Sequence, residues 1–159
     1  MKTLPVLSLA LLLTACSAGG HHGNGDDNYF SAFATLPDTQ WGYASPLTFS
    51  VDTLRDSISH HGDMLLTVRH THGYNFRNLW LEIVYDQADT LATPDTLNIV
   101  LADVYGHWRG NGSGPSLQVV DTIARDIPLR QNQKIRLRHI MRLDSVEGIE
   151  QVGITYLPR

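Results

Sequence analysis

Three side chains suited to binding lie in one glycine-rich segment, residues 102–114. Tyr105, Trp108 and Arg109 are residue types that often anchor protein interfaces, and four glycines surround them. The segment lacks the Gly-Lys-Ser/Thr ending of a phosphate-binding P-loop, which argues against nucleotide binding. Two interpretations remain: a loop that contacts a partner or ligand, or a loop in which Trp108 plugs one end of the domain. We expect the plug, with Tyr105 and Arg109 at its rim.

A second candidate site is a run of alternating basic residues. In an extended strand, Lys134, Arg136 and Arg138 share one face, and Arg130 and Arg142 lie close to them in sequence. Such a stripe fits an acidic partner or lipid headgroups. The alternative is a solvated strand face whose charges discourage pairing at the edge of a sheet.

Residues that bind metals or perform catalysis show no recognisable spacing. Among His60, His61, His70 and His72, the last two would point to the same side of a strand, with Asp63 as a further candidate ligand. No third ligand is fixed by spacing, and neither a His-Glu-x-x-His motif nor a Gly-x-Ser-x-Gly motif is present. We therefore expect no enzymatic activity, no metal and no cofactor.

The three tryptophans offer a further possibility, a platform for stacking sugars. Trp80 lies in a strongly apolar segment, so we expect it in the core. Exposure of Trp41 and Trp108 side by side on a concave face would favour carbohydrate binding. Burial of both would favour a module that binds other proteins.

The elements that position these side chains are expected to be strands. Apolar and polar residues alternate with period two, which is typical of half-buried strands, and turn residues separate the runs. Seven or eight short strands predict an all-β fold, an antiparallel β-sandwich of the Ig-like or jelly-roll kind. The alternating runs cover residues 47–51, 64–68, 79–85, 97–101, 117–119, 135–137 and 152–156, the turns include 45–46, 61–63, 93–95, 106–115 and 147–148, and one helical turn fits 144–147.

Composition narrows the function classes. The chain has 159 residues, enough for one domain, with 42% hydrophobic and 18% charged residues. Its formal net charge of −4 argues against a dedicated nucleic-acid-binding protein. A single cysteine excludes a disulfide within the chain.

The N-terminal residues have the pattern of an export signal. Lys2 precedes an apolar run over residues 4–13, which is too short to span a bilayer but suits a signal peptide. The run ends in Leu-Thr-Ala-Cys, the lipobox pattern of bacterial lipoproteins, although an ordinary secretion signal cleaved after Ala15 is the alternative. We predict a signal peptide over 1–15, lipidation of Cys16, a flexible tether over 16–30 and a β-sandwich over 31–159.

Several segments, taken in order, resemble the GldH family of gliding-motility lipoproteins of Bacteroidetes. The resemblance covers roughly residues 36–156. The segments that carry it are the lipobox at Cys16, Trp41, and residues 74–81, 95–97, 102–112, 139–142 and 148–154.

This resemblance implies a cell-envelope lipoprotein associated with gliding motility and with type IX secretion, and it offers no catalytic residues. We expect a non-enzymatic, lipid-anchored interaction module that faces the periplasm from the outer membrane. Its partners would be the membrane, through the lipid, and other envelope proteins of that machinery. Ser17, in place of Asp, agrees with outer-membrane sorting by analogy with enteric bacteria. The alternative is an envelope lipoprotein that binds or handles polysaccharide.

Overall fold

The computed structural model describes residues 30–52, 60–86, 93–112 and 114–159. The predicted signal peptide, Cys16 and the tether up to residue 29 lie outside this range. Within it, no helix is long and apolar enough to cross a bilayer. The strands are β1 (Phe30–Thr35), β2 (Gln40–Gly42), β3 (Leu47–Ser50), β4 (His60–Thr71), β5 (Asn78–Asp86), β6 (Asp95–Val100), β7 (Ser116–Leu129), β8 (Lys134–His139), β9 (Ser145–Glu147) and β10 (Ile149–Pro158), and a short 3-10 helix, η1 (Pro37–Thr39), precedes β2.

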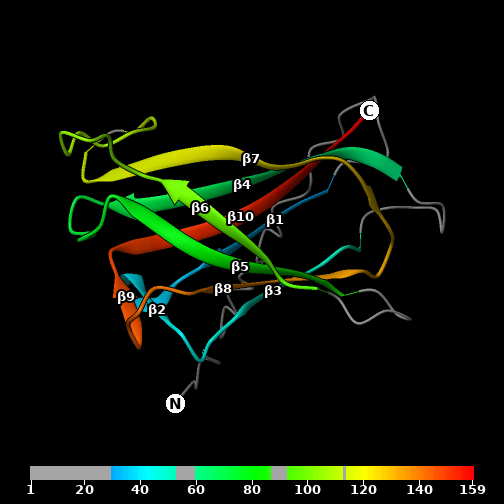
Figure 1. Ribbon diagram of the computed structural model, residues 1–159, viewed down its shortest axis with the longest axis horizontal. Helices are drawn as coiled ribbons and strands as arrows, with labels where there is room; N and C mark the ends of the chain where they lie inside the picture. The colour runs from blue at the N-terminus through cyan, green and yellow to red at the C-terminus, as the bar shows by residue number, and fades with distance from the viewer. Residues whose placement is uncertain (1–29, 53–59, 87–92, 113) are drawn as a thin grey trace, which may run out of the picture.

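The strand order decides between the two expected sandwiches. One four-stranded sheet has the order β1-β10-β4-β7, the other β3-β8-β5-β6, and β2 pairs with β9 beside them (Figure 1). If β2 and β9 are left out, the eight remaining strands can be numbered one to eight along the chain. The first sheet then has the order 1-8-3-6 and the second sheet has the order 2-7-4-5. This arrangement, with every pair antiparallel, is the jelly-roll.

The inner faces of the two larger sheets share one hydrophobic core. Alternation along each strand places apolar side chains inward, as in β8, where Ile135 and Leu137 are buried and the residues beside them in the strand are basic. Trp41, on β2, is fully buried, and its indole N–H donates to the Ser45 carbonyl at 3.0 Å. The other fully or nearly fully buried members from the two sheets include Phe30, Met64, Leu66, Leu79, Leu81, Ile83, Val152, Ile154 and Tyr156.

Three expectations about the elements were wrong in detail. The described residues contain ten strands, more than the seven or eight expected. The additional strands are β1 and the three-residue strands β2 and β9, which lack a strong alternating pattern. Residues 61–63 belong to the long strand β4 instead of a turn, and β9 replaces the helical turn at 144–147. The described chain starts with β1, whose first residue, Phe30, is buried and lies opposite Tyr156.

The jelly-roll gives the domain two different ends. Phe30, where the described chain enters β1, and Arg159 lie at the same end, which we call the terminal end (Figure 1). The strand order places four connections at the opposite end, which we call the loop end. These connections are residues 36–46, 72–77, 101–115 and 140–148.

Candidate interaction surface

Asp103 organises the tip of the 101–115 connection. Its Oδ1 accepts hydrogen bonds from the backbone N–H groups of Tyr105 at 2.8 Å and His107 at 2.9 Å, and its Oδ2 lies 3.0 Å from His107 Nδ1. These bonds, of which the one from the His107 backbone has the largest effect, lower the pKa of Asp103. The resulting turn leaves the side chains of Val104 71% and Tyr105 84% exposed. The loop end therefore presents an apolar pair on a hydrogen-bonded turn.

Trp108 closes the base of the same loop. It forms a β-bridge with Ala102, and its half-buried side chain packs against the core. Its ring lies 4.7 Å from that of His70, measured between centroids. Of the two residues expected at its rim, Arg109 is exposed beside it and Tyr105 lies at the loop tip. The role of Trp108 as a plug stays a prediction, which the stability measurement in the Discussion tests.

His70 is a fully buried titratable side chain beneath this loop. Its Nδ1 lies 3.0 Å from the Thr71 carbonyl oxygen, and its Nε2 has no hydrogen-bond partner among the described residues. Burial is the main cause that lowers the pKa of His70. A neutral imidazole that donates from Nδ1 fits these surroundings.

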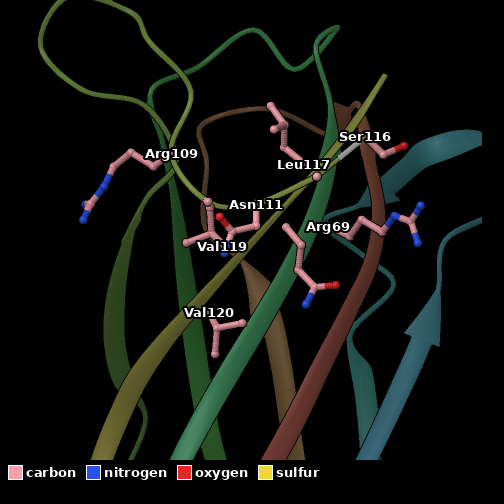
Figure 2. A pocket seen from close by; sticks show the side chains of 10 residues that line it. Arg69, Arg109, Asn111, Ser116, Leu117, Val119 and Val120 are labelled. Atoms are coloured by element: carbon pink, nitrogen blue, oxygen red, sulfur yellow. The ribbon is translucent and has the colours of Figure 1, made fainter. Parts of the chain in front are cut away.

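A groove of about 570 Å³ lies between residues 109–112 and the start of β7. Figure 2 shows that its two arginines, Arg69 and Arg109, point to opposite sides. Arg69 pairs with Glu150 at 2.9 Å, and the Ser116 hydroxyl donates to that same side chain at 2.8 Å. The cationic groups therefore do not converge, and the groove does not have the geometry of an anion site.

The basic stripe lies on the outer face of β8, as the alternation predicts. β8 is an interior strand of its sheet, so the idea that its charges protect a sheet edge was wrong. Arg136 pairs with Asp86 at 2.9 Å, and Arg138 pairs with Glu82 across from it on β5. Arg138 also lies over the Tyr43 ring, 5.0 Å from its centroid. Much of the positive charge of the stripe is thus neutralised within the domain.

The expectation that Trp80 is a core residue was wrong. Trp80 is 41% exposed on the outer face of β5, whereas its neighbours Leu79 and Leu81 are buried. Trp41 is fully buried, so it cannot form a sugar-stacking platform with Trp108. Trp80 lies instead beside a separate groove together with the exposed side chains of Phe76 and Leu143.

The histidines considered as metal ligands are not brought together. His70 is buried near the loop end of β4, whereas His72 is exposed in the turn beyond it. Asp63 lies toward the other end of β4 and pairs with Arg159 at 3.1 Å. In the described ranges, no group of three His, Cys, Asp or Glu side chains could hold a metal ion.

Comparison with models of known protein families identifies the family of this chain. The model of the GldH lipoprotein family matches residues 28–155, which is most of the chain. The chain belongs to the GldH lipoprotein family. It is therefore a lipoprotein, lipid-anchored in the cell envelope, as the resemblance implied.

Other comparisons add little to the description of this GldH lipoprotein. No curated protein sequence matches it significantly. Solved structures with some similarity include Eiger TNF from S. frugiperda, with 12% identity, a TM-score of 0.34, and coverage of 82% of this chain and 93% of that one. Another is the CBM35 from Cellvibrio japonicus Abf62, with 17% identity, a TM-score of 0.37, and coverage of 85% and 75%. Neither supports a functional inference.

The alternation of residues in β5 is a sequence signal for the exposure of Trp80. Leu79, Leu81 and Ile83 were expected on one face, which places Trp80 on the opposite face of the same strand. The apolar composition of the segment, which favours a core position, is therefore a poorer guide here than its alternation. Phe76 and Leu143 could not be found this way because each lies in a connection outside any strand.

Proposed function

We propose that this lipoprotein is a non-enzymatic interaction component of the gliding-motility and type IX secretion machinery, anchored in the outer membrane and facing the periplasm. Family membership supports the lipid anchor and the envelope location. The pattern of exposed side chains supports the interaction role, and Ser17 after Cys16 favours the outer membrane.

The observation that carries the proposal is that five of the nine exposed large hydrophobic side chains among the described residues lie in connections at the end opposite the chain entry. Residues 16–29 lead from the predicted lipid site to Phe30, at the terminal end. Phe76, Val104, Tyr105 and Leu143 are exposed in three connections at the loop end. Large apolar side chains exposed together typically mark a protein contact surface. The anchor therefore leaves this surface directed away from the attached end.

The proposal is tested with Cys16→Ser in the native host. We expect the variant to fold with an unchanged thermal midpoint but to leave the membrane fraction, because two or three acyl chains supply the anchoring free energy. Density-gradient separation of the wild-type membranes should place the protein with the outer membrane. Retention of Cys16→Ser on membranes after a high-salt wash would contradict anchoring at this residue.

The partner class needs a second measurement. Affinity purification of the full lipidated chain from crosslinked envelopes should enrich motility or secretion proteins relative to a sample from cells that lack the bait. Deletion of the gene should lower secretion through the same machinery. Normal secretion and no enriched envelope protein would refute the proposed role.

A further inference from the structure

A groove of about 660 Å³ at the loop end has no assigned role. It is open on the outer face of β5, within the size range of pockets that bind ligands or side chains. Five of its seven lining residues are apolar or aromatic. The lining residues are Phe76, Asn78, Trp80, Ile140, Met141, Arg142 and Leu143.

The groove exists because β8 is too short to cover the start of β5. The last residue of β8, His139, lies opposite Leu81, whereas β5 starts at Asn78. Ile140 still pairs with β5, its N–H donating to the Trp80 carbonyl at 2.9 Å, but the chain then bends away. Beyond this point, the outer side of Trp80 has no neighbouring strand on the β8 side among the described residues. The bend is tight, since the Leu143 N–H donates to the Met141 carbonyl at 2.7 Å.

The walls of the groove are held in place by the surrounding structure. The Trp80 backbone N–H donates to Met141 Sδ at 3.4 Å, which holds the thioether against β5. Phe76 packs edge-on against Tyr74 at 5.7 Å between centroids, and the Tyr74 hydroxyl donates to the Asn78 carbonyl at 2.9 Å. A preformed apolar groove loses little conformational entropy when it binds a partner.

The charge at the rim indicates what kind of partner fits. Arg136 and Arg138, on the same sheet face, are each paired with a carboxylate of β5. Arg142 is exposed and lines the groove, yet no carboxylate among the described residues pairs with it. An unpaired guanidinium beside an apolar groove favours a ligand that supplies a carboxylate next to apolar groups.

The lining favours protein over sugar. Sugar hydroxyls need several converging polar groups, and the groove offers only Asn78 and Arg142. The Asn78 side-chain amide already donates to Asn98 Oδ1 at 2.7 Å. Met141, Leu143 and the two aromatic rings are instead residue types enriched in the centres of protein interfaces or suited to apolar packing.

We propose that the groove beside Trp80 binds a protein partner through one or two bulky apolar side chains that lie next to an acidic residue, whose carboxylate pairs with Arg142. This inference rests on the proposed function and names the surface and the chemistry of its partner. Trp80 forms the apolar wall, and Arg142 selects for the carboxylate.

The experiment uses the full lipidated chain in native envelopes, with a photo-crosslinking amino acid replacing Leu143 at the rim. A second position, Val120, is the control, because it is 51% exposed on the outer face of the other large sheet. Crosslinking from position 143 is then repeated in Trp80→Ala and Arg142→Glu backgrounds. Arg130→Glu is the matched charge control, because Arg130 is also exposed and unpaired within the described residues but lies between β7 and β8 at the terminal end.

We expect a protein adduct from position 143 and none from position 120. Trp80→Ala should reduce the adduct by about tenfold, Arg142→Glu should reduce it several-fold, and Arg130→Glu should leave it unchanged. Mass spectrometry should map the adduct to a segment with a bulky apolar side chain beside Asp or Glu. Thermal midpoints of all variants establish that they are folded, and Arg142→Glu gives an answer even if Trp80→Ala is unstable.

Four results would overturn the assignment. They are a glycan adduct resistant to protease, equal adducts from positions 143 and 120, an adduct insensitive to both substitutions in the groove, and no adduct from position 143. If envelope proteins still enrich with the full chain in any of these cases, the proposed function stands and the groove alone is rejected. If nothing enriches, both fall together.

Discussion

The indole ring of Trp108 lies against the imidazole ring of His70, with centroids 4.7 Å apart and planes inclined by 54°. One ring comes from the glycine-rich connection and the other from the buried side of β4. The contact joins the base of the loop that carries the exposed side chains of Val104 and Tyr105 to the core.

Replacing Trp108 measures how much this contact stabilises the domain. A fully buried tryptophan loses about 3–5 kcal/mol on truncation to alanine. Because Trp108 is half-buried, we expect Trp108→Ala to lower the free energy of unfolding by about 2–3 kcal/mol in urea titrations. Tyr105→Ala, at the loop tip, should change it by less than about 0.5 kcal/mol. Equal and negligible effects would show that Trp108 is no plug.

Replacing Trp41 should destabilise the domain more than replacing Trp80, although the apolar sequence around Trp80 suggests that Trp80 is a core residue. Trp41 is fully buried and hydrogen-bonded, so Trp41→Ala should cost about 3–5 kcal/mol of unfolding free energy. Trp80→Ala should cost less than about 1.5 kcal/mol, because much of the side chain already contacts water. Chemical denaturation of both variants gives the comparison. A larger loss for Trp80 would mean that its outer face is covered.

Stability should fall as the pH drops below about 6.5. Burial lowers the pKa of both His70 and His139 in the folded state, so below that pH the unfolded chain binds more protons than the folded one. Their contribution is therefore present above the ordinary histidine pKa and is lost as the pH falls. Acidic side chains with lowered pKa values, such as Asp63 and Asp103, act only nearer pH 4.

His139→Phe tests the origin of this dependence. Both ring nitrogens of His139 are buried, the contact of the ring with the Trp41 backbone only partly offsets the effect of burial on its pKa, and the ring packs edge-on against the Trp41 side chain at 5.7 Å. An apolar ring of similar size should therefore fold, and it should flatten the decline in thermal midpoint between pH 7.5 and pH 5. A decline as steep as that of the wild-type protein would assign the effect to other groups.

Two glycines of the 101–115 connection should differ sharply in their tolerance of alanine. Both have positive φ, +87° at Gly106 and +90° at Gly110. A Cβ at Gly106 would meet nothing within 4 Å, so Gly106→Ala should cost only about 1–2 kcal/mol of backbone strain. At Gly110 the nearest atom, the Gln118 carbonyl oxygen, would lie at 2.1 Å, and the β-bridge between Asn111 and Gln118 would have to open. Thermal unfolding should show the larger loss for Gly110→Ala, and similar losses would contradict the close approach.

A strand of this fold could be predicted from the sequence only where apolar and polar residues alternate along it. β8 was predictable because Ile135 and Leu137 alternate with long basic residues. β1 was not, because the alanine side chains within it are small and Phe33 projects outward onto Gly153 of β10. The pairing that makes β1 a strand comes from the far end of the chain, which no local pattern reveals.

The candidate surface was harder to predict than the strands. Residue type alone makes Tyr105 and Arg142 candidates for binding, but nothing local indicates that residues 72–77, 101–115 and 140–148 share one end. That relationship follows from the strand order, and the Ig-like alternative would have arranged the connections differently. The groove beside Trp80 also requires knowing that β8 stops at His139, one residue short of the position opposite Trp80.

The pairing of β1 with β10 has a consequence for how the domain forms. Ser31 and Thr155 share a hydrogen bond across 124 positions of sequence, and β1 is an edge strand with β10 as its sole strand neighbour in the described sheet. During synthesis and export, β1 therefore stays unpaired until β10 has been delivered. Such high contact order slows folding. A truncation that removes only β10 should leave Phe30 and the sheet edge open, and so yield an aggregating chain in place of a smaller folded domain.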